Sequence, residues 1–84
     1  MKYRLLIDLD VYDLLAALPK RERRMLRKRF DELLEAPAHW TQFEERDAVG
    51  RSIGVTICGR FAVRFWDDLA DHQIKILGIV PAGH

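Results

Sequence analysis

The chain has 84 residues, of which 49% are hydrophobic and 32% charged, and its formal net charge is +1. This balance is typical of one small globular domain spanning residues 1–84, and it excludes a disordered or fibrous chain. The lone Cys58 cannot form an internal disulfide, no apolar run reaches the ~18 to 20 residues that span a bilayer, and no signal-peptide pattern is found, so we expect a cytoplasmic protein without membrane contact.

The first elements are read from hydrophobic spacing. Residues 2–9 alternate between polar and apolar positions, which predicts a strand with one buried face, formed by Tyr3, Leu5, Ile7 and Leu9. A short helix is predicted to follow from an N-cap at Asp10, with an apolar stripe at Val11, Leu14, Leu15 and Leu18. Pro19 disfavours helical geometry at the preceding residue but suits the first turn of a helix. We therefore expect a break there and an immediate second helix, making a helical hairpin.

The second helix has an apolar stripe at positions i, i+4, i+7 and i+8, formed by Leu26, Phe30, Leu33 and Leu34. It is predicted to end near Pro37. Residues 37–50 show no sustained period, so we expect a loop there, anchored by the aromatic rings of Trp40 and Phe43.

The C-terminal half is predicted to be strands. Residues 53–58 and 61–66 alternate around Gly59 and indicate an antiparallel hairpin. Residues 74–80 are apolar at nearly every position, which favours an internal strand or one covered on both faces. The order β-α-α-β-β-β indicates an α+β fold, in which an antiparallel-dominated sheet packs against the two-helix hairpin.

The second helix begins with an unusual concentration of positive charge. Residues 20–30, KRERRMLRKRF, hold seven basic side chains and a single acid, Glu22. Such a run is most often the solvated face of a helix. Here, however, the cations crowd the N-terminal turn, where they oppose the helix dipole, and they have few acidic neighbours. A phosphate backbone or an acidic protein would neutralise this patch, and the candidate RNA-binding residues on it are Lys20, Arg21, Arg24 and Lys28.

A second basic group is predicted on the sheet. Arg60 and Arg64 are four residues apart and so share one face of a strand, and Arg51 precedes the neighbouring strand. RNA cleavage by an attacking 2′-hydroxyl needs a cation at the phosphate, a base and an acid. The candidates for acid and base are Glu44 or Glu45, and His84. Ordinary surface charges are the alternative interpretation.

A metal site is not expected. Asp67, Asp68, Asp71 and His72 have suitable side chains but no recognised ligand spacing, and Asp-rich turns are common. We therefore expect neither a metal nor an organic cofactor.

Several of these features occur together in one known superfamily. The element order, the break at Leu18-Pro19, the helix ending Leu33-Leu34-Glu35-Ala36-Pro37 and the strand Gly59-Arg60-Phe61-Ala62-Val63-Arg64-Phe65 resemble the RelE/ParE toxins over essentially the whole chain. The resemblance implies the toxin of a type II toxin-antitoxin pair. It also implies a cognate antitoxin as partner, and apolar surface on a helix or sheet edge would be covered by a segment of that antitoxin.

The superfamily contains more than one activity. RelE-like members cleave mRNA on the ribosome without a metal, whereas ParE-like members inhibit DNA gyrase. By resemblance, Arg60 is similar to an arginine that steadies the scissile phosphate, and Glu45 and His84 lie near positions that one ribonuclease branch uses for catalysis. The chain lacks the terminal Arg and Tyr that the ribonucleases commonly use. The favoured hypothesis is a ribosome-dependent endoribonuclease, and a gyrase inhibitor or a non-catalytic binding module on the same fold remain the alternatives.

Overall fold

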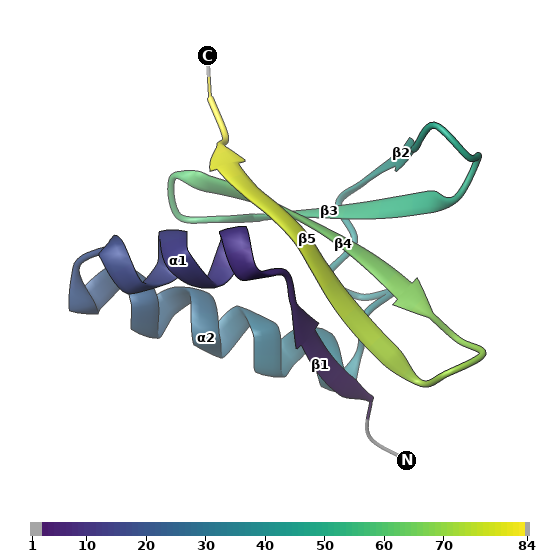
Figure 1. The fold of residues 1–84 in the computed structure, drawn as a ribbon, viewed down its shortest axis with the longest axis horizontal. Helices are drawn as coiled ribbons and strands as arrows, with labels where there is room; N and C mark the ends of the chain where they lie inside the picture. The colour runs from purple at the N-terminus through teal and green to yellow at the C-terminus, as the bar shows by residue number, and fades with distance from the viewer. Residues whose placement is uncertain (1–2, 84) are drawn as a thin grey trace.

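The computed structural model describes residues 3–83, which form a five-stranded sheet and two helices (Figure 1). The elements in chain order are β1 (Arg4–Ile7), α1 (Leu9–Ala17), α2 (Lys20–Glu35), β2 (Phe43–Arg46), β3 (Ser52–Cys58), β4 (Phe61–Asp68) and β5 (Gln73–Pro81). The strand order in space is β1-β5-β4-β3-β2. β1 pairs with β5 in parallel and all the other pairs are antiparallel, so the predicted fold class is confirmed.

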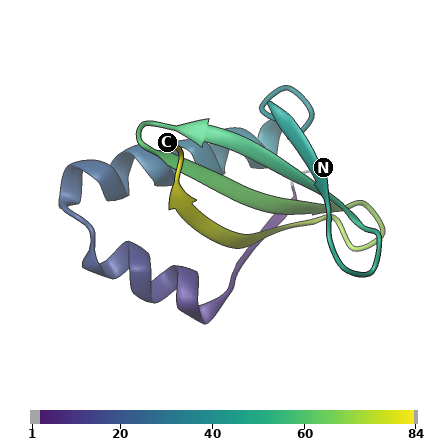
Figure 2. The same cartoon turned by 90° about the horizontal axis from the view of Figure 1, so that it is seen from above.

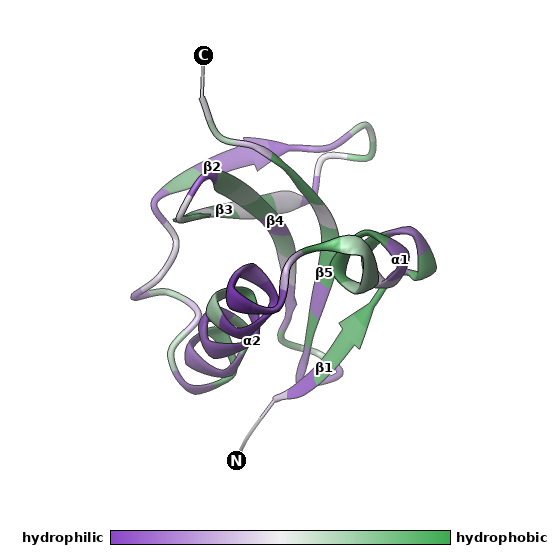
Figure 3. Cartoon of the chain, turned by 90° about the vertical axis from the view of Figure 1, so that its left-hand side faces the viewer, coloured by the Kyte–Doolittle hydropathy of each residue, from purple (hydrophilic) through white to green (hydrophobic). Residues whose placement is uncertain are grey.

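The core lies between the helices and one face of the sheet. The predicted stripe of α2 is buried at Leu26, Phe30 and Leu33, whereas hydrophilic residues cover much of the rest of this helix (Figure 3). The sheet contributes inward-facing side chains of β4 and β5, namely Phe61, Val63, Phe65, Ile74, Ile76 and Ile79. Burial of these apolar groups is the main driving force for folding. Within residues 3–83, neither helix is long and apolar enough to cross a lipid bilayer.

The break between the helices occurs where proline predicts it. Leu18 adopts an extended conformation (φ −80°, ψ 154°), and Pro19 is the N-cap of α2. The guanidinium of Arg23 donates hydrogen bonds to the carbonyls of Ala16 and Leu18, at 3.3 and 3.2 Å. These bonds satisfy carbonyls that the end of a helix leaves unpaired. The helices diverge from this short connection (Figure 2).

The start of α1 differs from the prediction. Asp8, not Asp10, is the N-cap, so Leu9 belongs to the helix and its side chain is 73% exposed. The predicted first strand is correspondingly shorter. Leu9 continues the apolar alternation of the strand, but it lies in the first turn of α1. The alternation therefore extended the predicted strand beyond its end at Ile7.

The predicted loop over residues 37–50 is also partly wrong, because it contains β2. All four residues of β2 are exposed, and they pair with β3 through the backbone, with Phe43 opposite Val55 and Arg46 opposite Ser52. An exposed edge strand needs no apolar alternation, so hydrophobic spacing does not detect it. Trp40 packs against the core as predicted, but Phe43 is 59% exposed and anchors nothing there.

The hairpin and the last strand match their predictions more closely. Gly59 has a φ of +60° in the turn between β3 and β4, a conformation that favours glycine. β5 lies between β1 and β4, so it is internal. Both helices lie on one face of the sheet, which leaves the opposite face available for other contacts.

Candidate functional site

The face of the sheet opposite the helices is built by strand register. Residues directly opposite one another on neighbouring strands share a face. Val55 pairs with Arg64, and Trp66 pairs with Lys75. The alternate residues of β4 are buried in the core, so Arg64, Trp66 and Lys75 project away from the helices.

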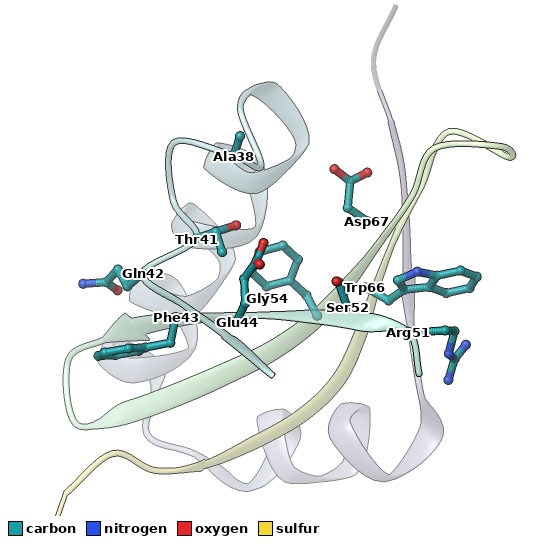
Figure 4. A pocket seen from close by; sticks show the side chains of 11 residues that line it. Ala38, Thr41, Gln42, Phe43, Glu44, Arg51, Ser52, Gly54, Trp66 and Asp67 are labelled. Carbon is teal, nitrogen blue, oxygen red and sulfur yellow. The ribbon is translucent and has the colours of Figure 1, made fainter. Parts of the chain in front are cut away.

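Trp66 holds two cations on this face. The guanidinium carbon of Arg51 lies 4.6 Å from the centre of the indole ring, and Nζ of Lys75 lies 5.3 Å from it. Figure 4 shows the Arg51 side chain beside the ring. Both distances are within the range of cation–π attraction. We call Arg51, Arg64 and Lys75 the basic face.

Two of these three cations also have acidic partners. Nε of Arg64 lies 2.9 Å from a carboxylate oxygen of Glu45 on β2, and Nε of Arg51 lies 2.6 Å from Asp47. Burial opposes ionisation of Asp47, but hydrogen bonds from the backbone and side chain of Arg51 outweigh it and lower the pKa of Asp47. Within residues 3–83, Lys75 makes no ion pair, so its charge remains available to a ligand.

Arg60 lies elsewhere, in the turn that precedes β4. Its guanidinium makes two hydrogen bonds to the carboxylate of Glu22 on α2, at 2.6 and 2.9 Å. The hydrogen bond from Arg60 is the main reason why the pKa of Glu22 is lowered. The Arg60 side chain is still 63% exposed. The single acid of residues 20–30 therefore forms its ion pair with the turn before β4.

The turn that carries Arg60 lies against α2. A Cβ at Gly59 would lie 2.5 Å from the terminal carbon of Met25, so the turn is in close contact with a side chain of α2. The backbone N–H of Ala82 donates to the carbonyl of Arg60 at 2.9 Å, so the chain after β5 passes this turn. The remaining predicted catalytic residue, His84, lies outside the described residues.

Arg60 and Glu45, both predicted catalytic residues, are not brought together. Glu45 pairs with Ile53 at the start of β3, whereas Arg60 follows the end of that strand. Six residues separate Ile53 from Arg60, and at about 3.3 Å for each residue of a strand the backbones of Glu45 and Arg60 lie about 20 Å apart. Within the predicted set, the structure instead joins Glu45 to Arg64.

The basic side chains of α2 include a group that is exposed to solvent and one, Arg29, that has a structural role. The predicted RNA-binding residues of α2 are all exposed and form no ion pair within residues 3–83; they are Lys20, Arg21, Arg24 and Lys28. Arg29 is different, because it reaches across to the sheet. It donates to Oγ1 of Thr56 at 2.6 Å and to the carbonyl of Ile57 at 2.8 Å, and it stacks 4.2 Å from the centre of Trp40.

Sequence reasoning missed this role of Arg29, although a signal was present. Arg29 lies three residues after Leu26 and four before Leu33, which places it on the buried side of the helix. An arginine at that position can extend its apolar stem along the core and place its charge at an acceptor.

The Asp-rich turn has a structural role. Oδ1 of Asp68 accepts a hydrogen bond from the backbone N–H of Asp71 at 3.3 Å. Among the residues that the structure describes, no three His, Cys, Asp or Glu side chains are grouped as metal ligands would be.

Comparison with solved structures gives an informative match. No protein-family model matches the chain, and no curated protein sequence does. Among solved structures, the chain is similar to a chain in the crystal structure of the archaeal RelE-RelB complex from Pyrococcus horikoshii OT3, with a TM-score of 0.84 and 25% sequence identity. The match covers 100% of this chain and 99% of that chain. Agreement over the full length, together with the element order and the helical hairpin described above, shows that the chain belongs to the RelE/ParE superfamily of toxins from toxin-antitoxin modules.

Proposed function

We propose that the chain inhibits translation by binding mRNA on the ribosome and cutting it without a metal. The observation that carries the proposal is the basic face, where Trp66 orients Arg51 and Lys75 beside Arg64. Because both cations lie against the indole ring, they are oriented before a ligand arrives. Cations ordered along an open sheet suit the phosphates of a single RNA strand.

The contact between Arg64 and Glu45 supports a cleavage mechanism. An RNA phosphate at Arg64 would lie beside the carboxylate, which can take the proton of the 2′-hydroxyl. The 2′ oxygen then attacks phosphorus, the bond to the 5′ oxygen breaks, and that oxygen takes up a proton. Arg64 compensates the charge that develops on the phosphate, Arg60 contacts a more distant phosphate, and His84 is the candidate donor of the last proton.

A binding module without catalysis is the second candidate function. It is favoured by the separation of Arg60 from Glu45 and by the ion pair that each already makes. An inhibitor of DNA gyrase would use the same exposed cations to hold its target and would need no acid or base.

The cognate antitoxin is the expected protein partner. A groove of about 480 Å³ lies between α1, α2 and β1, lined by apolar side chains that include Ile7, Leu15 and Phe30. Arg23 and Arg27 also border it, and Tyr12 of α1 is largely exposed beside it. An amphipathic helix of the antitoxin would bury this apolar surface and place its acidic residues at the two arginines.

The test uses the purified chain, free of antitoxin, in a translation reaction. Primer extension is expected to reveal new 5′ ends in ribosome-bound mRNA, and Glu45→Gln is expected to remove them. Asp71→Asn, in an exposed turn, is the matched control. Intact mRNA at an excess of toxin would contradict the ribonuclease proposal. Filamentation of cells with continuing protein synthesis would support the gyrase alternative instead.

A further inference from the structure

The face of the sheet opposite the helices, here called the outer face, carries an aromatic ring in register with the basic face. Phe43 on β2 pairs with Val55 on β3, and Val55 pairs with Arg64 on β4. Gly78 on β5 completes this row, because it pairs with Arg64. Directly paired residues share a face, and Arg64 projects away from the helices, so Phe43 also lies on the outer face.

The neighbour of Phe43 on β2 points the other way. Glu44 and Asp67 line a cavity of about 520 Å³ on the helix side of the sheet. Phe43 lies at the border of this cavity, and its ring points away from the space between Thr41 and Asp67 (Figure 4). The ring is therefore presented to whatever binds the outer face.

The outer face has an apolar floor of its own beside this ring. Ile53 and Val55 are 0% and 6% exposed, although neither belongs to the cluster between the sheet and the helices. They alternate with Gly54, which lies against a core side chain, so they are on the outer face. Side chains of that face cover them. Arg64 is one of these, because it reaches across β3 to place its Nε 2.9 Å from Glu45 on β2.

Phe43 is an aromatic ring without an aromatic or cationic partner. It is 59% exposed, and within residues 3–83 it makes no ring contact and no cation–π contact. Trp66 on the same face differs, because Arg51 and Lys75 already lie against its indole. The π face of Phe43 therefore remains open to a planar group.

A single nucleotide can span the Phe43 ring and the Arg64 guanidinium. Arg64 contacts Glu45, which lies two residues from Phe43 on the same side of β2, about 7 Å along the strand. A nucleobase and the phosphate of its own nucleotide are separated by a similar distance. On the other side of Arg64, a Cβ at Gly78 would meet nothing within 4 Å, so the surface there is open as well.

The charges around the ring favour RNA as the occupant over a protein segment. From Arg64 the basic face continues to Lys75 and Arg51, and a nucleic-acid strand carries a phosphate at every nucleotide to meet such a series of cations. Open aromatic rings beside ordered cations are the means by which sheet surfaces hold single-stranded RNA.

We propose that Phe43 stacks on a nucleobase of the RNA strand whose phosphate contacts Arg64. This inference rests on the proposed RNA binding and adds a nucleobase subsite to it. Stacking needs only the π face of a nucleobase, so the subsite accepts all four and favours the larger purines. Phe43 is a positioning residue, because a stacked nucleobase keeps the ribose of that nucleotide near Glu45.

The test is fluorescence anisotropy of the full chain with three labelled strands of equal length. They are oligoadenylate, oligouridylate and an abasic strand with the same number of phosphates, all with 2′-O-methyl groups so that no 2′ oxygen can attack. We expect oligoadenylate to bind at least about fivefold more tightly than the abasic strand, and oligouridylate to lie between them.

Variants of Phe43 locate the stacking. Phe43→Leu keeps an apolar side chain but removes the π face, so it should weaken oligoadenylate by about fivefold or more and leave the abasic strand unchanged. Phe43→Trp should retain the wild-type preference. Leu69→Ala is the control, because Leu69 is 68% exposed in the turn after β4, outside the row. Phe43 is largely exposed, so its variants should fold.

Two further readouts separate stacking from phosphate contacts. The salt dependence of binding should be the same for Phe43→Leu and the wild type, because no phosphate contact is lost. A 2-aminopurine in the strand should lose fluorescence on binding the wild type and lose less on binding Phe43→Leu. A changed salt slope in Phe43→Leu would assign its effect to phosphates and overturn the proposal.

The remaining outcomes distinguish this inference from the proposed function. Equal affinities for oligoadenylate and the abasic strand, or an equal effect of Phe43→Leu on both, would overturn the nucleobase subsite and leave RNA binding intact. No saturation by any strand below about 1 mM would overturn the subsite and the RNA contact of the basic face together.

Discussion

Replacing Lys75 by Gln should change how RNA binding depends on salt. Lys75 lies at Trp66 without an acidic partner among residues 3–83, so its removal loses one complete phosphate contact. Each contact with a single strand contributes about −0.7 to the slope of log K against log salt. The three cations of the basic face contribute about −2.1 to this slope, and the two that remain in the variant contribute about −1.4. Between 50 and 200 mM salt, the affinity of the wild type should therefore fall by a factor about 2.6 times larger than that of Lys75→Gln.

The assay is fluorescence anisotropy of a short single-stranded RNA titrated with the purified chain at several salt concentrations. Arg46→Gln is the matched control, because Arg46 is exposed on β2 and lies outside the basic face. This substitution removes the same charge as Lys75→Gln. Equal slopes for Lys75→Gln and the wild type would refute the assignment of Lys75 to the RNA contact. If Arg46→Gln reduced the salt slope as much as Lys75→Gln, the slope would depend only on the net charge of the protein.

Three further predictions concern the ion pairs. Glu45→Gln should strengthen binding of the same RNA, because it releases Arg64, while abolishing cleavage; weaker binding in the anisotropy assay would contradict this. The pKa of Glu22 is lowered in the folded state, so its pair with Arg60 stabilises the protein above the ordinary glutamate pKa of about 4.3 and loses this effect as pH falls through the lowered value. The difference in melting temperature between wild type and Glu22→Gln should accordingly shrink in acid, and a pH-independent difference would argue against it. Arg29→Met should lower the free energy of unfolding in urea by about 2 to 4 kcal/mol, because two acceptors lose their donor; a change below about 1 kcal/mol would show that water replaces it.

The elements that sequence reasoning found are those whose apolar residues recur regularly. The apolar stripe predicted α2 and the apolar alternation predicted β4, because one face of each element is buried in the core. β2 was missed because its four residues are exposed and its pairing is made by the backbone. The start of α1 was misplaced because Leu9 continued an alternation that belongs to the preceding strand.

The candidate site was less predictable than the fold, since ion pairing depends on residues distant in the chain. The sequence pattern placed Arg60 and Arg64 together on one strand, but the pair Arg60–Glu22 joins residues 38 positions apart and the pair Arg64–Glu45 joins residues 19 apart. The cavity that Glu44 and Asp67 line has no signal in the sequence, because its lining residues come from separate elements.

By itself, the sequence determined the helical hairpin, the β3–β4 hairpin, the buried stripe and the concentration of positive charge on α2. These follow from local rules: proline geometry, the two side-chain periods and the count of charged residues. Only the tertiary structure decided which cations remain free and which pair with an acid. The physical reason is that a charge acts on whatever lies within a few ångströms, and register and helix packing choose those neighbours.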